Sequence, residues 1–171
     1  MKQLYEKYMR NFDDSQRAMA CSLESITYCV KLINTFGLTN ILDLGSGVST
    51  LLFLSQYDNI RSMDTDPKWA NKTEAIIRDL LNIQFNVNTN LRDIKDNQYD
   101  FIFYDLGNLE DRIYNFPQIL SLGAKYIYLD DFHILPYRYY VESKINGYRL
   151  VYLPETIDSF GRFGALLIKN N

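Results

Sequence analysis

The sequence is poor in the side chains that usually bind zinc or form disulfides. It has one histidine, His133, and two cysteines, Cys21 and Cys29. These are too few for a zinc site built from cysteine and histidine. The two cysteines fall on one predicted helix, about 12 Å apart along its axis, which is too far for a disulfide. We therefore predict a reduced, cytoplasmic protein with both cysteines in its core.

The sequence also lacks an excess of basic residues and any long apolar run. Its 171 residues include 18 Lys and Arg against 21 Asp and Glu, for a net charge of -3. A nucleic-acid-binding protein usually carries a basic face, so we expect no nucleic-acid partner. No run approaches the roughly 18 apolar residues of a membrane helix, and the N-terminus does not resemble a signal peptide. We expect no membrane association.

Short apolar segments alternate with amphipathic ones along the chain. The pattern predicts strands at residues 41–44, 59–63, 83–87, 99–104, 126–129, 148–153 and 163–169. It predicts helices at residues 4–12, 19–36, 49–55, 67–81, 109–120 and 137–145. The alternation is typical of an α/β fold, with a doubly wound, mostly parallel, seven-stranded sheet. The last two strands have no helix-length connection, so they must form an antiparallel hairpin. Pro117 is expected to bend or break its helix.

We expect residues 1–171 to form a single Rossmann-like domain, because the chain is long enough for one sizeable core. Residues 18–169 would be the core of that domain. Residues 1–17 contain an amphipathic helix with two interpretations. It could be a lid over a small substrate, or it could simply pack on the sheet.

Acidic residues stand at the ends of several predicted strands. They are Asp43, Asp64, Asp105, Asp130 and Asp131. Ligands of doubly wound sheets bind beyond these strand ends, so the carboxylates should rim one crevice. Because like charges repel, we expect a cationic ligand or a metal ion to compensate them.

The turn after the first strand reads ILDLGSGVST. Gly45 and Gly47 allow a tight bend, but Thr50 stands where a dinucleotide site has its third glycine. Asp43 would repel a pyrophosphate and suits an ammonium group. Asp64 follows Gly45 at nearly the spacing of a carboxylate that binds ribose. These features favour a nucleoside with a cationic tail, such as S-adenosylmethionine.

Three stretches, ILDLGSGVST, MDTDP and YDFIFYD, resemble motifs of the class I S-adenosylmethionine-dependent methyltransferases. The terminal hairpin is similar as well. The resemblance implies that the methionine part of the cofactor contacts Asp43, Gly45, Ser46 and Gly47. It implies that the ribose and adenine lie near Asp64, Thr65 and Asn88, and that Asp105 also borders the cofactor.

The strand-end acids are similar to those of the catechol O-methyltransferase-like group. There, an Asp after strand four and an Asp-Asn pair after strand five hold a divalent cation, which implies a Mg2+ site at Asp105, Asp130 and Asp131. Two features depart from that pattern: Asp131 replaces the Asn, and DLGNLEDR lacks the expected lysine. DDFH also resembles metal-free relatives in which Asp or His contacts the substrate, so both interpretations stay open.

These observations predict methyl transfer from S-adenosylmethionine to an oxygen of a small molecule. Asp105, Asp131 and His133 are the candidate catalytic residues, since histidine is a common general base near neutral pH. Two alternatives remain: an NAD-dependent oxidoreductase, and a non-catalytic cofactor-binding module of the same fold. The sequence defines neither the methyl acceptor nor the oligomeric state.

Overall fold

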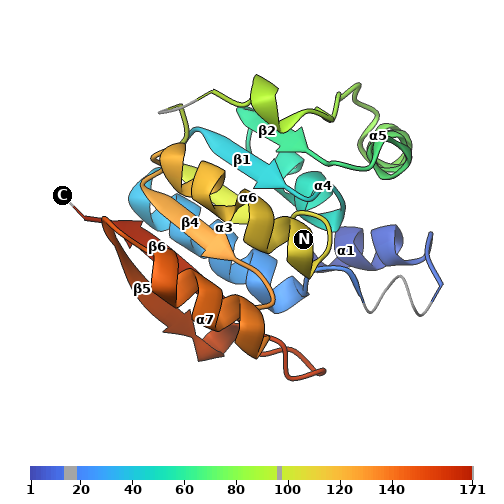
Figure 1. Cartoon of the computed structure of the whole chain (residues 1–171). Helices are drawn as coiled ribbons and strands as arrows, with labels where there is room; N and C mark the ends of the chain where they lie inside the picture. The colour runs from blue at the N-terminus through green and yellow to red at the C-terminus, as the bar shows by residue number, and fades with distance from the viewer. Residues whose placement is uncertain (14–18, 96–97, 171) are drawn as a thin grey trace.

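A mixed sheet of six strands forms the centre of the molecule (Figure 1). The computed structural model describes residues 1–13, 19–95 and 98–170. The strand order is β2-β1-β3-β4-β6-β5. The strands span Ile41–Leu44 (β1), Ile60–Met63 (β2), Phe101–Tyr104 (β3), Tyr126–Leu129 (β4), Tyr148–Leu153 (β5) and Gly164–Lys169 (β6). Within these residues, the expected α/β class is confirmed.

The first four strands run parallel, and β6 runs antiparallel to both β4 and β5. This confirms the terminal hairpin. The parallel strands place all their carboxyl ends at one edge of the sheet, where ligands of such folds bind.

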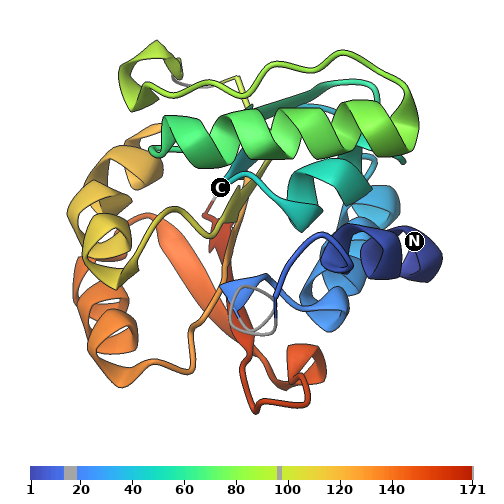
Figure 2. The same cartoon turned by 90° about the vertical axis from the view of Figure 1, so that its right-hand side faces the viewer.

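Helices cover both faces of the sheet (Figure 2). They span Lys2–Met9 (α1), Leu23–Phe36 (α3), Val48–Leu54 (α4), Pro67–Leu81 (α5), Leu109–Ser121 (α6) and Leu135–Lys144 (α7), with 3-10 turns at Leu91–Asp93 and Pro154–Thr156. Alternate residues of each strand serve the two layers. Phe101 and Phe103 pack in the cluster with α3 and α4, whereas Ile102 and Tyr104 pack in the cluster with α6 and α7.

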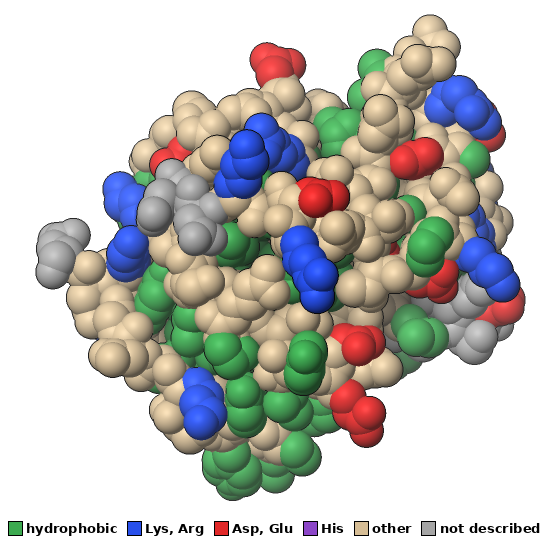
Figure 3. All heavy atoms as spheres, turned by 45° about the horizontal axis from the view of Figure 1, so that its top comes forward, with side chains coloured by type: hydrophobic (Ala, Val, Ile, Leu, Met, Phe, Trp, Pro, Cys, Tyr) green, Lys and Arg blue, Asp and Glu red, His purple; other side chains and the backbone are tan. Residues whose placement is uncertain are grey.

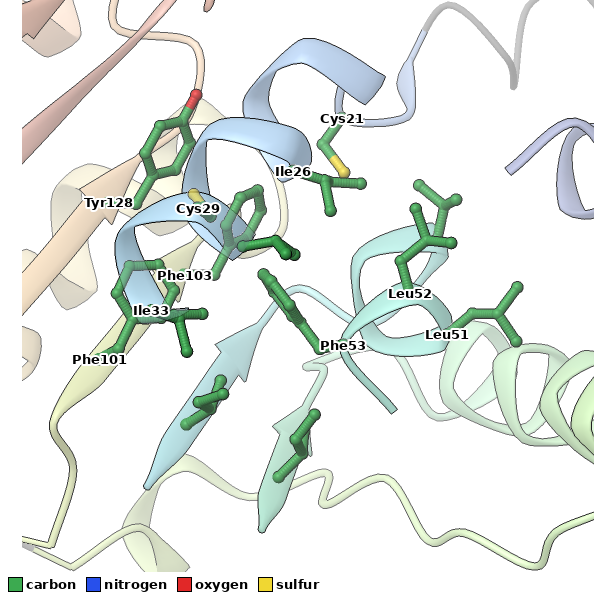
Figure 4. Close-up of a cluster of buried hydrophobic side chains, with 14 of the residues drawn as sticks. Cys21, Ile26, Cys29, Ile33, Leu51, Leu52, Phe53, Phe101, Phe103 and Tyr128 are labelled. Carbon is green, nitrogen blue, oxygen red and sulfur yellow. The ribbon is translucent and has the colours of Figure 1, made fainter. Parts of the chain in front are cut away.

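Aromatic rings fill the layer between α3, α4 and the sheet (Figure 4). Phe103 stacks on Tyr128 with ring centroids 4.9 Å apart, and Phe53 meets Phe103 edge-on at 5.7 Å. All three side chains are fully buried. Aromatic rings packed this way stabilise the fold by more than their buried area alone. They therefore hold β3 and β4 firmly in place, below the edge where their carboxyl ends lie.

The helix predicted at residues 19–36 begins later than expected, at Leu23. Ser22 caps it by accepting a hydrogen bond from the Ser25 N–H, and Gly37 ends it with left-handed backbone. Met19 and Cys21 therefore lie outside α3, so the prediction that both cysteines share one helix was wrong. Cys21 and Cys29 are nevertheless both buried and free.

The strand predicted at residues 83–87 does not form, so the sheet has six strands instead of seven. Only Asn88 pairs with β2, through hydrogen bonds of 2.9 Å to the backbone of Ser62 and Asp64. Ile83 is 39% exposed. Val87 is buried, but its N–H donates to the Glu74 side chain at 2.7 Å and not to a neighbouring strand.

Two further expectations concern helices. Helix α6 continues through Pro117, so the predicted break is absent; Phe116 and Ile119 on either side are fully buried and hold it in place.

The N-terminal helix forms as Lys2–Met9, while residues 14–17 of the predicted lid segment, and residue 18, lie outside the described residues. In the described part of the chain, no helix is long and apolar enough to cross a membrane.

The molecular surface in Figure 3 shows lysine and arginine side chains scattered among neutral and acidic ones. This face, as far as its residues are described, presents no continuous basic patch.

Candidate cofactor-binding and active site

A cavity of ≈ 660 Å³ lies beyond the carboxyl ends of the parallel strands. Its wall contains the turn after β1, the ends of β2 and β3, the start of α6 and the segment after β4, and α1 closes one side. Among the described residues, the charged side chains that line it are four aspartates and two arginines: Asp64, Asp66, Asp105, Asp131, Arg112 and Arg162. The cavity is therefore anionic on balance.

Gly45 allows the turn after β1 to approach β3 closely. Its φ is +104°, a conformation that favours glycine, and a Cβ built there would overlap the carbonyl oxygen of Asp105. Gly47 differs, since its φ of 167° is extended backbone that any residue adopts. A side chain at Gly47 would instead point toward the hydroxyl of Tyr8, 3.5 Å from the Cβ position. The sequence requires glycine more strongly at 45 than at 47.

Asp43 lies beneath this turn and does not line the cavity. Its Oδ2 accepts hydrogen bonds from Ser49 Oγ at 2.9 Å and Thr50 Oγ1 at 2.5 Å, and the Gly47 N–H donates to Thr50 Oγ1 at 3.1 Å. Asp43 Oδ1 is buried with no hydrogen-bond partner among the described residues. Burial raises the pKa of Asp43 to about 7, although the two hydroxyls lower it. Its charge is therefore only partly compensated.

Asp64 faces the cavity from the end of β2. Its Oδ2 accepts hydrogen bonds from the N–H and hydroxyl of Ser46, at 2.9 and 3.1 Å, and its Oδ1 accepts the Asp66 N–H at 2.9 Å. Burial raises its pKa, against the lowering effect of these bonds. Hydroxyls and backbone amides hold this carboxylate, and they carry no full positive charge.

Trp69, at the start of α5, also lines the cavity and was not predicted. Its indole N–H donates to the carbonyl oxygen of Ser46 at 2.5 Å. One signal in the sequence could have indicated it: Trp69 is the only tryptophan, and it follows the capped helix start Asp66-Pro67. Trp69 thus ties α5 to the turn after β1.

Thr65 and Asn88, the predicted neighbours of adenine, are both exposed and lie outside the cavity lining. Asn88 instead extends the sheet by bridging to Met63. These two residues border the outer end of β2 beyond Asp64.

Asp105, Asp130 and Asp131 come together at the ends of β3 and β4. Each offers a carboxylate oxygen, and these oxygens lie within 4.8 Å of one another. The guanidinium of Arg112, from α6, lies among them: Nη2 is 2.5 Å from Asp105 Oδ1 and Nη1 is 2.9 Å from Asp131 Oδ2. Arg112 is only 7% exposed. The sequence analysis missed it entirely.

The cluster of these four residues is strongly coupled. Burial raises the pKa of Asp105 well above its ordinary value and the pKa of Asp130 to about 6, while Arg112 lowers both. Burial lowers the pKa of Arg112, but the three carboxylates outweigh it and raise that pKa overall. Arg112 is therefore a permanent cation. A metal ion bound to the cluster would have to displace it, so the donor set does not fit a resident metal alongside the guanidinium.

His133 lines the cavity next to this cluster. Its Nδ1 lies 3.8 Å from Asp131 Oδ1, too far for a hydrogen bond, and has no partner among the described residues although it is buried. Asp131 has a φ of 53°, unusual for a residue other than glycine. This left-handed backbone turns the chain directly after β4.

Helix α1 and the residues after it both pack and line the cavity. Tyr8 and Phe12 are buried in the core, and they line the cavity together with Met9. Phe12 lies 5.5 Å from Trp69, ring centroid to ring centroid, and Lys72 Nζ lies 3.9 Å from the centroid of the Phe12 ring. The segment therefore packs on the core and also borders the cavity, so packing on the sheet and a role as a lid are compatible.

No protein-family model and no curated protein sequence matches the chain. Solved structures do match it in fold. An O-methyltransferase from Bacillus cereus, in complex with SAH, is 16% identical with a TM-score of 0.72, over 98% of this chain and 91% of that one. The magnesium protoporphyrin IX methyltransferase from Synechocystis PCC 6803, with bound SAM, is 14% identical with a TM-score of 0.62, over 86% and 79%. The ribosomal protein L11 methylase from Lactobacillus delbrueckii subsp. bulgaricus is 16% identical with a TM-score of 0.57, over 78% and 70%.

These likenesses show that the chain has the class I methyltransferase fold. The matching proteins are named for different methyl acceptors, a porphyrin and a ribosomal protein among them. A fold shared by such different proteins does not define what one of them acts on.

Proposed function

We propose that this protein transfers a methyl group from S-adenosylmethionine to an oxygen of a small molecule. The observation that carries the proposal is the anionic cavity beside the turn after β1. A phosphorylated dinucleotide would meet Asp64 there and the buried charge of Asp43 behind the turn. Thr50 stands where a dinucleotide site has its third glycine. Its hydroxyl donates to Asp43 and accepts a hydrogen bond from the Gly47 N–H.

In this proposal the cofactor lies over the turn after β1 and extends from the end of β2 to the end of β3. Asp64 binds a ribose hydroxyl through the one lone-pair direction that its three hydrogen bonds leave. The backbone of Gly45, Ser46 and Gly47 borders the methionine part, with Asp43 acting through its charge. The adenine extends past Asp64 toward Thr65 and Asn88.

The bound cofactor supplies a methyl group on a positively charged sulfur. The protein then has three tasks: to align the acceptor, to exclude water and to take up the proton of the acceptor hydroxyl. We assign the proton to His133, whose imidazole lies in the cavity wall. Asp131 borders this imidazole, with its Oδ1 3.8 Å from His133 Nδ1. Asp105 and Asp131, both bound to Arg112, would position the acceptor.

Calorimetric titration separates this function from NAD-dependent oxidation. We expect S-adenosylmethionine and S-adenosylhomocysteine to bind one per chain and NAD to give no heat of binding. Measurable NAD binding without binding of either sulfur nucleoside would overturn the proposal.

A radiolabelled methyl-release assay against a panel of hydroxylated metabolites separates an enzyme from a non-catalytic binding module. For the best acceptor, His133→Gln should lower kcat by about 10² to 10⁴-fold with little change in cofactor affinity. Unchanged turnover in His133→Gln would remove this residue from the mechanism, and cofactor binding without turnover of any acceptor would favour the module.

A further inference from the structure

We propose that the Arg112 guanidinium takes the place of a divalent cation among Asp105, Asp130 and Asp131, so that this site works without a metal. Removing the guanidinium should then turn the cluster into a divalent-cation site. The proposal extends the proposed function, since it defines which cation serves the acceptor side of the cavity. Its main test nevertheless requires neither cofactor nor turnover.

The geometry of the cluster supports this exchange of one cation for another. Three carboxylate oxygens within 4.8 Å of one another suit a hard divalent ion, which binds oxygen ligands at roughly 2.0 to 2.6 Å. Arg112 reaches Asp105 at 2.5 Å and Asp131 at 2.9 Å, through different nitrogens. The guanidinium therefore engages one oxygen of Asp105 and one of Asp131, and a divalent ion placed among the three carboxylates would lie directly against this positive charge.

Arg112 is held in this place by its backbone as well as by its ion pairs. Its N–H donates to the Asn108 carbonyl oxygen at 3.0 Å, and Asn108 caps α6 in a reciprocal pair of bonds with Asp111. Its own carbonyl oxygen accepts the hydroxyl of buried Tyr104 at 2.8 Å. The start of α6 is thus fixed on β3, and the fixed helix directs one cation into the carboxylates.

The charge of the cluster also supports the assignment of Arg112 as its cation. Asp130 is buried, and it has no ion pair of 4.0 Å or less with a described basic side chain; the charge of Arg112 compensates it most, and that of Arg162 less. Without Arg112, the described cation left to act on the three carboxylates would be Arg162, which already pairs with Asp158 at 2.7 Å. Such a cluster either takes up protons or binds a divalent ion. We therefore assign to Arg112 a positioning role that a metal ion could partly replace.

Mn2+ binding, followed by the loss of its free electron paramagnetic resonance signal, tests the proposal directly. The wild-type protein should show no stoichiometric binding. Arg112→Ala should bind one Mn2+ per chain at least about tenfold more tightly than wild type, and Mn2+ should raise its melting temperature but not that of wild type. Arg78→Ala is the matched control, because Arg78 pairs with Asp79 on the surface; it should behave as wild type.

The double variant Arg112→Ala/Asp105→Asn should lose the gained site. Equal, weak Mn2+ binding in wild type and Arg112→Ala would overturn the proposal. If Arg112→Ala does not fold, wild type and Asp130→Asn decide the question: stoichiometric Mn2+ binding by wild type that Asp130→Asn abolishes overturns it, and its absence in both supports it. Since no arm depends on methyl transfer, a failure here is distinct from a failure of the proposed function.

Discussion

Two groups of carboxylates meet at the same edge of the sheet, and they are stabilised in different ways. Asp43 and Asp64, at the ends of β1 and β2, are held by hydroxyls and backbone N–H groups. Asp105 and Asp131, at the ends of β3 and β4, are held by the guanidinium of Arg112. The first group keeps a net negative charge that acts on the cavity. The second group is partly neutralised from within the chain.

The difference indicates how the cavity divides its work. Neutral donors lower the cost of burying a carboxylate without cancelling its charge, so the β1–β2 side remains attractive to a cationic ligand. On the β3–β4 side the chain already supplies the cation. We therefore expect a positively charged sulfur nucleoside on the first side and an uncharged or weakly charged acceptor, with no metal, on the second.

The largest expected effect comes from removing the internal cation. Arg112→Ala should lower the free energy of unfolding by about 3 to 5 kcal/mol at pH 8, because it leaves buried carboxylates uncompensated. The deficit should shrink on acidification, since the carboxyls with raised pKa values bind protons in the folded state and lose the charge that needs Arg112. Urea unfolding between pH 5 and 8 measures this. A deficit that grows at low pH would contradict the assignment, and Arg78→Ala should stay within about 0.5 kcal/mol of wild type.

The next effect comes from separating the two groups. Gly45→Ala forces a Cβ against the Asp105 backbone and adds strain at a positive φ, so it should cost about 2 to 4 kcal/mol and weaken cofactor binding more than tenfold. Gly147 also has a positive φ, 77°, but a Cβ added there would meet no atom within 4 Å. Gly147→Ala should cost only about 1 kcal/mol and leave binding unchanged. Equal losses in the two variants, by chemical unfolding and calorimetry, would mean that the close approach at Gly45 is unimportant.

An opposite sign is expected for Asp43→Asn. The pKa of Asp43 is about 7 in the folded protein against an ordinary 3.8, so its stability contribution is fully present below pH 3.8 and is lost as the pH rises through about 7. The amide has no such loss. At pH 8 the variant should therefore be more stable than wild type, by roughly 1 to 3 kcal/mol, with no gain at pH 4.

The same Asp43→Asn variant should bind S-adenosylmethionine more weakly, because the charge behind the turn is gone. Thermal unfolding at the two pH values and calorimetry check both parts. A variant that loses stability at pH 8 and keeps full affinity would remove Asp43 from the account.

The smallest expected effect concerns Trp69. Trp69→Phe removes the indole N–H that donates to Ser46 but keeps an aromatic ring beside Phe12. The free energy of unfolding should fall by about 1 kcal/mol, with a loss of cofactor affinity of a fewfold. Chemical unfolding and calorimetry measure these changes. A loss of cofactor affinity as large as that of Gly45→Ala would contradict this expectation, because it would show that the indole ring itself contacts the cofactor.

Much of the fold could be predicted because local patterns and burial agreed. β1 and β4 are buried along their whole length, and both were predicted with their observed bounds. The segment at residues 83–87 has apolar residues too, but the Val87 N–H is bound by the side chain of Glu74 on α5, a tertiary contact that no local pattern records. The cap at Ser22 was likewise overlooked because apolar spacing continued through Met19.

The candidate site could be predicted only on the strand side. Acids at strand ends meet because parallel strands end together, so the grouping of Asp105, Asp130 and Asp131 followed from the sequence. Arg112 reaches them from a helix, and its direction depends on how α6 packs on Tyr104. A signal did exist: Arg112 is the only basic residue between Asp105 and Ala124. Asking which cation lies nearest along the chain would have found it.

The most direct test of the account is equilibrium dialysis of the unmodified protein against a mixture of S-adenosylmethionine, NAD and Mn2+. We expect the protein to retain one S-adenosylmethionine per chain and neither NAD nor Mn2+. Retention of NAD, or of stoichiometric Mn2+, would contradict it.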